Sequence, residues 1–504
     1  MVNIPKTTDI KLNVRPVKIS ICHNYAFEGP CRFEGGDNLK KEYDLNVNAE
    51  ENEKFINKVR ATFPADDANI LNPVHIQVDE SFFVDEKDVD EIGKGHQNVD
   101  LYFVSTRAGN TLLEFAQKYK KPIMPLFGPR TTAAFLARGL EVYPCETWGD
   151  AVELIKVLRL RKALAETRAL TLVRMNSTTA PGMLDSFTSL ENVTTRLGTR
   201  FVHYNIHEFI DQTLNVPDDT NPTTPGKHEP NINDKDEVEI NRMTDEFIGG
   251  AVECDMKREN VYPSMKAHYL VNKLLAKLGC NAFTVPCFDI CATRRLNEER
   301  FTFCLNHSLN NENGISSACE HDTCALLSMV VLSNAAKAPA YMGNTNVNPL
   351  KNGVRTQGVR PLAEGIIGEL EDIENLVLTW HSVPNRKLKG YNTKTAPYAI
   401  RSFTHSGWGA TIRYDFNQDK GQKITMCRFD PSCTKLFVAK GNIVGGTGYN
   451  DVNCSEGVFF QVKDARDFFE KQSLVGIHIP LVYGDCFERI VKLGKILGLE
   501  VLTA

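Results

Sequence analysis

A carboxylate, an amide and three imidazoles in the second half of the chain are the side chains best suited to chemistry. They are Glu320, Asn344, His381, His405 and His478. Such a mixed set of oxygen and nitrogen donors suits Mn²⁺ or a similar divalent cation, with coordination positions left open for a substrate. Distance along the sequence is no objection, because folding brings separated side chains together. A lone histidine is more often structural than a ligand, so spacing alone leaves the structural interpretation open.

A second group of possible ligands is rich in sulfur and lies between residues 287 and 324. Its members are Cys287, Cys291, Cys304, His307, Cys319, His321 and Cys324. These residue types bind zinc or iron–sulfur clusters, but their spacings match no known ligand pattern. The chain has 14 cysteines and no C-x-x-C motif, which favours buried free thiols. A metal–thiolate site is therefore the less favoured alternative.

The segment from Gly314 to Asn344 is expected to position the first group. Glu320 precedes an apolar run with helical spacing, and Asn344 follows a glycine at the far end of that run. The helix is predicted from Ala325, Leu326, Met329, Val330 and Leu332. A helix between two polar ends can present two oxygen ligands to one pocket. The alternative is a buried helix with a polar cap.

The N-terminal part alternates strand-like and helical patterns. Residues 17–22 and 99–105 are short, β-branched and bounded by polar residues, which predicts buried parallel strands in a doubly wound sheet. No G-x-G-x-x-G follows these strands, so a dinucleotide site is not expected. Arg107 and Asn110 lie just beyond the second strand, where ligands of such sheets bind. They could contact a polar substrate, or equally well cap the next helix.

Three domains are predicted. Residues 1–168 and 169–350 each read as a doubly wound αβα domain, and the second contains a polar, proline-rich loop at residues 216–236. Short strands separated by turns follow in residues 351–504, which predicts an antiparallel, β-barrel-like domain with a terminal helix. The fold class is therefore α/β with an added β domain.

The composition excludes some classes of partner. The 504 residues are 42% hydrophobic and 24% charged, with a formal net charge of −5, which gives no support to nucleic-acid binding. No apolar run approaches the roughly 20 residues that span a bilayer, and the first residues contain no signal-peptide pattern. We expect a cytoplasmic protein that does not bind membranes.

Motifs from residue 280 to the C-terminus resemble the L-fucose/L-arabinose isomerase superfamily. The sequence GISSACEHD at residues 314–322 is similar to the family's metal-binding glutamate motif, and Asn344 lies 24 positions after Glu320, where fucose isomerases have a second acid. His478 precedes Gly484 by six positions, as the family's late histidine ligand precedes a glycine. The sequence NLVLTWHSVPNRK resembles the segment that supplies another histidine, here His381.

The resemblance implies a metal-dependent aldose–ketose isomerase that acts on a fucose-like, arabinose-like or modified sugar. The implied ligands of a divalent metal, most simply Mn²⁺, are Glu320, Asn344, His478 and His381. The metal would hold O1 and O2 of the open-chain sugar and stabilise an enediolate, with Glu320 as the catalytic base. Relatives assemble as trimers, tetramers or hexamers with sites at subunit contacts, so a homo-oligomer is expected.

Two departures from the family pattern bear on the chemistry. Asn344 replaces the second acid, and an amide cannot carry a proton near neutral pH. Asp322, the nearest carboxylate in the sequence, could transfer the proton instead. His321 replaces a small residue, usually glycine, and its imidazole could contact the substrate or turn away. The alternative function is a sugar-binding or regulatory protein without turnover.

Overall fold

The computed structural model describes residues 3–23, 41–79, 83–106, 108–173, 183–213, 232–287, 294–349, 370 and 373–504. The chain divides into two compact units. The smaller is Ile10–Arg159, and the larger combines Met1–Asp9 with Leu160–Ala504. Of the helices described, none is both long and apolar enough to cross a bilayer.

The smaller unit is built on a parallel sheet with the strand order β2-β1-β4-β5, and β3 also pairs with β1. The strands are β1 (Leu12–Ile21), β2 (Ala68–Ile70), β3 (Val74–Val78), β4 (Leu101–Thr106) and β5 (Ile123–Pro125). The helices are α1 (Lys41–Thr62), α2 (Glu86–Gly93), α3 (Gly109–Tyr119), α4 (Pro129–Leu136) and α5 (Trp148–Ala165). The strands predicted at residues 17–22 and 99–105 are confirmed as β1 and β4.

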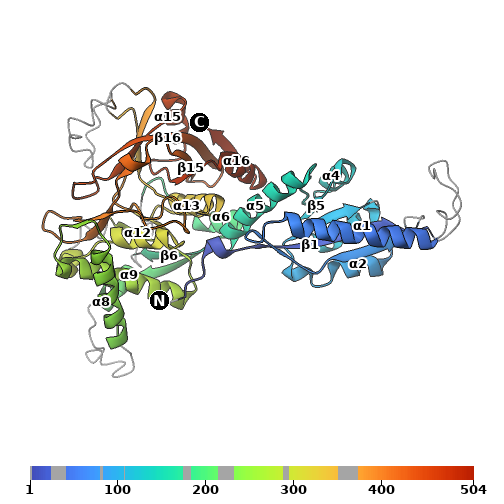
Figure 1. Ribbon diagram of the computed structural model, residues 1–504, viewed down its shortest axis with the longest axis horizontal. Coiled ribbons are helices and arrows are strands. Elements are labelled where there is room, and N and C mark those ends of the chain that lie inside the picture. Colours follow the sequence, from blue (N-terminus) through green and yellow to red (C-terminus); the bar gives the residue numbers. More distant parts are fainter. Residues whose placement is uncertain are drawn as a thin grey trace. The chain divides into compact units, whose positions relative to one another are not determined.

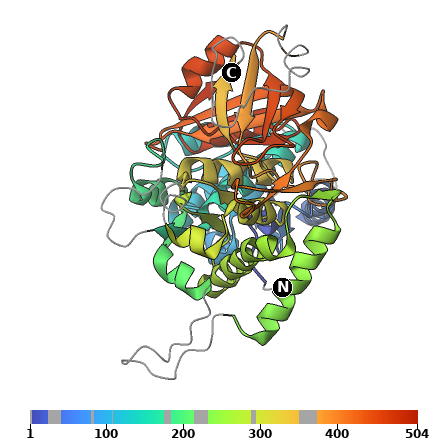
Figure 2. The ribbon, with the colours of Figure 1, turned by 90° about the vertical axis from the view of Figure 1, so that its left-hand side faces the viewer.

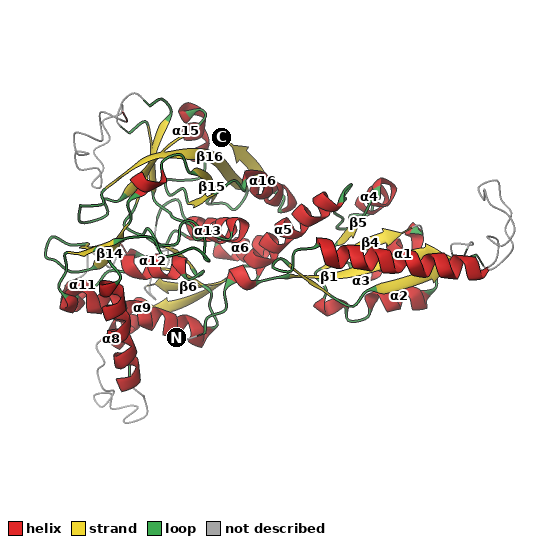
Figure 3. Ribbon diagram, in the orientation of Figure 1, coloured by secondary structure: helices red, strands yellow, loops and turns green. Residues whose placement is uncertain are grey.

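Neighbouring side chains on β4 show that helices cover both faces of this sheet. Successive residues of a strand point to opposite faces. Tyr102 packs against Phe115 of α3 with ring centroids 4.7 Å apart, whereas Phe103 packs against Phe55 of α1 at 5.7 Å. The unit therefore has the layered αβα arrangement expected from the sequence (Figure 3).

A second parallel sheet, of order β10-β9-β6-β7, forms the base of the larger unit. Its strands are β6 (Arg168–Val173), β7 (Arg200–Asn205), β9 (Ala282–Thr284) and β10 (Ser316–Ala318). Its helices are α6 (Leu190–Leu197), α7 (Ile206–Thr213), α8 (Asp234–Gly249), α9 (Arg258–Leu278), α11 (Arg294–Glu299) and α12 (Cys304–Glu312). Thr284 of β9 pairs with Ala318 of β10, so the loops that follow these two strands leave the sheet side by side.

Helix α13 (Thr323–Ala336) lies between this parallel sheet and the C-terminal sheet. It contacts β9 and β10 on one side and β15 and β18 on the other, and Figures 1 and 2 both show it in this middle layer. All of its residues but the last are buried. A helix that is apolar on every face is stable only when it is buried in this way. The predicted helix is confirmed, and Asp322 caps its N-terminus.

The C-terminal sheet is mainly antiparallel, with the order β11-β12-β17-β16-β15-β18 and β19 paired parallel to β16. Its strands are β11 (Asn344–Val347), β12 (Leu376–Trp380), β15 (Lys423–Phe429), β16 (Lys435–Thr447), β17 (Gly457–Gln461), β18 (Leu481–Tyr483) and β19 (Glu500–Thr503). Helices α15 (Ala465–Gln472) and α16 (Phe487–Ile496) belong to the same segment. In the residues described the sheet is open, so the barrel-like closure predicted from strand spacing is not what the structure shows.

Two strands predicted for this sheet belong elsewhere. β13 (Ala399–Ser402) and β14 (Ala410–Arg413) form a small separate sheet with β8 (Glu253–Cys254). Strand length and turns cannot reveal such a partner, because β8 lies far upstream in the chain. The loop predicted at residues 216–236 lies mostly outside the described residues, and α8 begins at Asp234. Residues 169–350 and 351–504 share one compact unit, and their division into two domains stays a prediction.

Candidate metal centre

Glu320 lies in the loop that joins β10 to α13, at the carboxyl edge of the parallel sheet. Its N–H donates to Cys287 Sγ at 3.2 Å, and the N–H of His321 donates to the carbonyl of Val285 at 2.9 Å. Both contacts join this loop to the one that follows β9. Glu320 and His321 have φ values of 59° and 54°. Two consecutive non-glycine residues in the left-handed region are costly, and such strain concentrates at functional sites.

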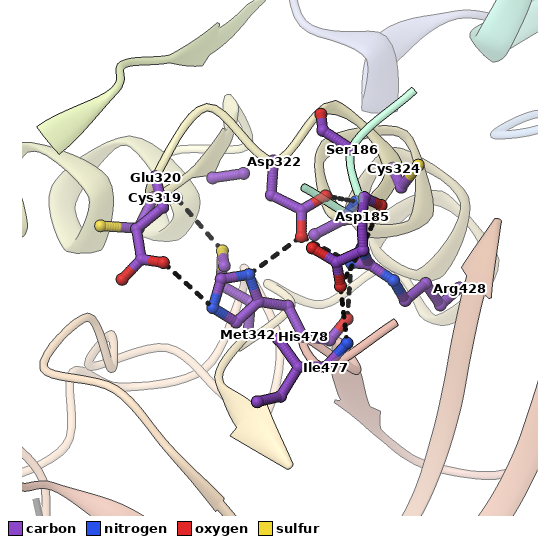
Figure 4. A network of polar contacts seen from close by, with 12 residues as sticks. Asp185, Ser186, Cys319, Glu320, Asp322, Cys324, Met342, Arg428, Ile477 and His478 are labelled. Atoms are coloured by element: carbon purple, nitrogen blue, oxygen red, sulfur yellow. Dashed lines mark hydrogen bonds and ion pairs between the residues drawn. The ribbon is translucent and has the colours of Figure 1, made fainter. Parts of the chain in front are cut away.

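Asp322 fixes the orientation of His478. Its Oδ1 accepts the N–H of Ala325 as the helix cap, and its Oδ2 lies 2.9 Å from His478 Nδ1 (Figure 4). An ionised carboxylate can only accept hydrogen bonds, so Nδ1 carries the proton. The Nε2 of His478 is then left with its lone pair for a ligand, as in metal sites where a carboxylate orients a histidine.

Arg428 holds Asp322 in its ionised form. Its guanidinium lies 2.6 Å from Asp322 Oδ2 and also donates to the carbonyl of His478 at 2.8 Å. Burial alone would raise the pKa of Asp322, but Arg428 and His478 outweigh it and lower this pKa to about 2. Arg428 also contacts Asp185, whose Oδ2 accepts the N–H of Ile477 at 2.7 Å. The buried guanidinium thus joins three segments of the chain around His478.

The turn before His478 requires glycine. Gly476 has a φ of 126°, and a Cβ at this position would lie 2.1 Å from Asp185 Oδ2 and 2.7 Å from a guanidinium nitrogen of Arg428. Only a residue without a side chain can therefore approach both groups. This close approach sets the path of the backbone that delivers His478.

His381 lies on the other side of Glu320, just beyond β12. Its Nδ1 is 3.1 Å from Cys454 Sγ, which also accepts the N–H of Ser382 at 3.4 Å. Burial alone would raise the pKa of Cys454 and lower the pKa of His381. The electrostatic attraction between the two side chains outweighs burial, so the pKa of Cys454 is lowered and the pKa of His381 is raised. The contact with Cys454 directs His381 Nε2 toward Glu320.

Each oxygen of Glu320 faces a different imidazole. Oε1 lies 3.3 Å from His381 Nε2, and Oε2 lies 3.6 Å from His478 Nε2. Burial raises the pKa of Glu320, but the two histidines lower it more. Within the described part of the chain, neither Glu320 Oε2 nor His478 Nε2 has a hydrogen-bond partner, although both are buried. Burying two polar atoms without hydrogen-bond partners costs folding free energy unless a bound ligand contacts both of them.

The spacing of these two donors fits one cation. Ligand atoms bound about 2.1 Å from an ion lie roughly 3.0 Å apart at right angles and roughly 4.2 Å apart on opposite sides. The 3.6 Å between Glu320 Oε2 and His478 Nε2 falls between these limits. The residues present therefore fit a divalent metal ion.

Asn344 lies beside His478. It is half-buried at the start of β11, and its backbone forms an antiparallel bridge with that of His478. Residues directly opposite in such a bridge have side chains on the same face. The approach of β11 to β12 depends on Gly343, because a Cβ there would lie 2.7 Å from the carbonyl oxygen of Trp380.

The remaining predicted residues are more dispersed. His321 is buried next to Glu320, whereas His405 is exposed and lies 3.2 Å from Asn453 Nδ2. Asn110 belongs to the smaller unit, where it lines a cavity of about 660 Å³ with Thr106 and the first turn of α4. Arg107 lies outside the described residues.

The competing cysteine group is only partly assembled. Cys287 Sγ lies 2.9 Å from Cys319 Sγ, and the donor atoms of Cys319, Glu320 and His381 all lie within 4.8 Å of one another. His307 instead contacts Ser317 Oγ at 2.8 Å through Nδ1. Cys291 lies outside the described residues. The two groups that were predicted as alternatives therefore share one centre at Glu320.

Sequence reasoning missed three residues of this centre. Asp185, Arg428 and Cys454 contact the predicted residues from distant segments, and no motif marks any of them. No family model and no curated protein matches this chain.

Proposed function

We propose that the chain is a metal-dependent sugar isomerase that interconverts an aldose and a ketose. One observation carries the proposal: Glu320 Oε2 and His478 Nε2 are buried, lie 3.6 Å apart and have no hydrogen-bond partner among the described residues. The strained loop at Glu320 and the fixed orientation of His478 are consistent with a site built to hold a ligand.

Glu320, His478 and Asn344 would hold the metal, and His381 would orient Glu320 through its other oxygen. Oxygen and imidazole donors of this kind accept Mn²⁺, which is the cation that we propose. When bound, the metal supplies Lewis-acid stabilisation of the negative charge that develops on the substrate oxygens. The substrate class is a fucose-like, arabinose-like or modified open-chain sugar.

The chain's own acid–base groups divide into two kinds. We assign Glu320, as a metal-bound carboxylate, to accept the proton that leaves the substrate carbon. Asp322 is occupied by the helix cap, His478 and Arg428, and its low pKa keeps it ionised. We therefore assign Asp322 to positioning of His478. His321 lies beside Glu320 and contributes to substrate binding.

The setting proposed for this activity is cytoplasmic, in a homo-oligomer such as a trimer, tetramer or hexamer. Asn110 and Arg107 are proposed as further residues that bind the sugar. Size-exclusion chromatography with light scattering measures the oligomeric state directly.

The second candidate is a sugar-binding or regulatory protein without turnover. Asn344 favours it, because its amide stands on the same face as His478 and cannot carry a proton. In this case the site binds the metal and the sugar, and no hydrogen moves between C1 and C2.

Exchange of the C2 hydrogen with solvent distinguishes the two candidates. The Mn²⁺-loaded protein is incubated with a panel of aldoses and ketoses in D₂O, and deuterium at C2 of the aldose and at C1 of the ketose is followed by NMR. The isomerase predicts exchange that Glu320→Gln abolishes and His405→Gln, an exposed histidine control, preserves. Sugar binding without exchange supports the second candidate. If Asn344→Asp then gains exchange, the missing acid is the reason.

A further inference from the structure

The two carboxylate oxygens of Glu320 face two different sets of possible metal ligands. Oε2 faces His478 Nε2, with Asn344 beside it, and these belong to the proposed metal site. Oε1 faces His381 Nε2 at 3.3 Å, and the thiol of Cys319 completes a cluster whose donor atoms lie within 4.8 Å of one another. The ring centroids of His381 and His478 are 5.7 Å apart, and each ring directs its Nε2 at a different oxygen of Glu320.

We propose that Cys319 Sγ, Glu320 Oε1 and His381 Nε2 form a second cation position, and that Glu320 bridges two metal ions. The inference rests on the proposed function, because both positions share this carboxylate. A carboxylate that bridges two ions about 3.5–4 Å apart is a recurring arrangement in metalloenzymes.

The spacing of two of the three donors fits a small four-coordinate ion, and all three donor atoms lie within 4.8 Å of one another. Around such an ion, with bonds of about 2.0–2.3 Å, neighbouring donors lie roughly 3.3–3.7 Å apart. The 3.3 Å between Glu320 Oε1 and His381 Nε2 is within this range. All three side chains are buried, with exposed fractions of 3% for Cys319, 7% for Glu320 and 2% for His381. A fourth position remains for water or substrate.

The surroundings also hold the donors in place. Cys454 contacts the far nitrogen of His381, just as Asp322 contacts the far nitrogen of His478. Both imidazoles therefore direct Nε2 toward Glu320, each at a different oxygen. The N–H of Cys319 donates to Met342 Sδ at 3.2 Å, and that of Glu320 donates to Cys287 Sγ, so the backbone of this loop is fixed.

The donor set indicates which cation binds at each position. A thiolate is a soft ligand that favours Zn²⁺ or Co²⁺ over Mn²⁺, whereas the amide, carboxylate and imidazole of the first position accept Mn²⁺. The structure thus assigns a thiophilic divalent cation to the second position. Ligation would release the thiol proton of Cys319 and the proton on His381 Nε2 to solvent, because metal ligands bind in their deprotonated form.

Cobalt tests the second position directly. The metal-free protein is titrated with Co²⁺, bound metal is counted after gel filtration, and the near-ultraviolet charge-transfer band of a thiolate–cobalt bond is recorded. The wild type should bind two equivalents and show the band. Cys319→Ser should lose the band and one equivalent, whereas Cys324→Ser, a nearby buried thiol outside the cluster, should keep both.

The outcomes separate this inference from the proposed function. Wild-type protein that binds one equivalent without the band overturns the second position and leaves the isomerase intact. A band that survives in Cys319→Ser also overturns it. If Cys319→Ser does not fold, the stoichiometry and band of the wild type still decide. Two equivalents with the band, but no C2 exchange, would support the second position and contradict the isomerase.

Discussion

Asp322 Oδ2 lies 2.9 Å from His478 Nδ1, although 156 positions separate the two residues in the sequence. The contact joins the N-cap residue of helix α13 to a turn of the C-terminal segment. Because Arg428 contacts both Asp322 and the carbonyl of His478, the pair is held as one rigid unit. The position of the histidine donor therefore depends on residues that need not touch a metal or a substrate.

Replacement of Asp322 by Asn should weaken metal binding without removing a ligand. An amide in place of the carboxylate no longer fixes the proton on His478 Nδ1, and loss of such an orienting partner typically lowers affinity about 10–100-fold. Competition with a fluorescent chelator measures the change. Asp419→Asn is the matched control, because Asp419 is also buried and paired, with Lys389 at 2.7 Å. Equal affinity in Asp322→Asn and the wild type would contradict the positioning role.

Acid should destabilise the fold through the same carboxylate. The folded-state pKa of Asp322 is about 2, below its ordinary value of 3.8, so its contribution is present above about pH 4 and is lost as the pH falls toward about 2. The difference between these two pKa values corresponds to about 2 kcal/mol of unfolding free energy. Urea unfolding of the metal-free protein at several pH values measures it. The Asp322→Asn variant should show a shallower acid dependence, and identical slopes would refute this explanation.

Gly476→Ala should disturb both the fold and the site. A Cβ at this position overlaps Asp185 and the guanidinium of Arg428, and the φ of 126° is strained for alanine. We expect a loss on the order of 2 kcal/mol in the free energy of unfolding, together with weaker metal binding. Gly249→Ala is the control, because no atom lies within 4 Å of a Cβ there. Metal affinity that stays unchanged in Gly476→Ala would mean that this turn does not position His478.

Helix α13, which anchors the site, could be predicted from the sequence because the pattern that indicates it lies within one short segment. The apolar residues of α13 recur at helical spacing, and Glu320 and Asp322 stand immediately before them, so one short segment held enough information. The parallel strands β1 and β4 were predicted for the same reason. By contrast, β13 and β14 were placed in the wrong sheet, because their partner β8 lies about 150 residues upstream.

The partners of the site residues could not be predicted in this way. Arg428 reaches Asp322 across 106 positions, and Cys454 reaches His381 across 73. Residue types alone do not reveal which buried charges are paired. The sequence also presented the cysteine group and the histidine group as alternatives, because nothing in the spacing shows that Cys319 and His381 both lie close to Glu320.

A calorimetric titration of the metal-free protein with Mn²⁺ tests the metal centre most directly. We predict binding to the wild type, loss of binding in Glu320→Gln and in His478→Gln, and normal binding in His405→Gln, because His405 is exposed and contacts Asn453. Binding that is absent from the folded wild type, or that persists unchanged in both Glu320→Gln and His478→Gln, would contradict it.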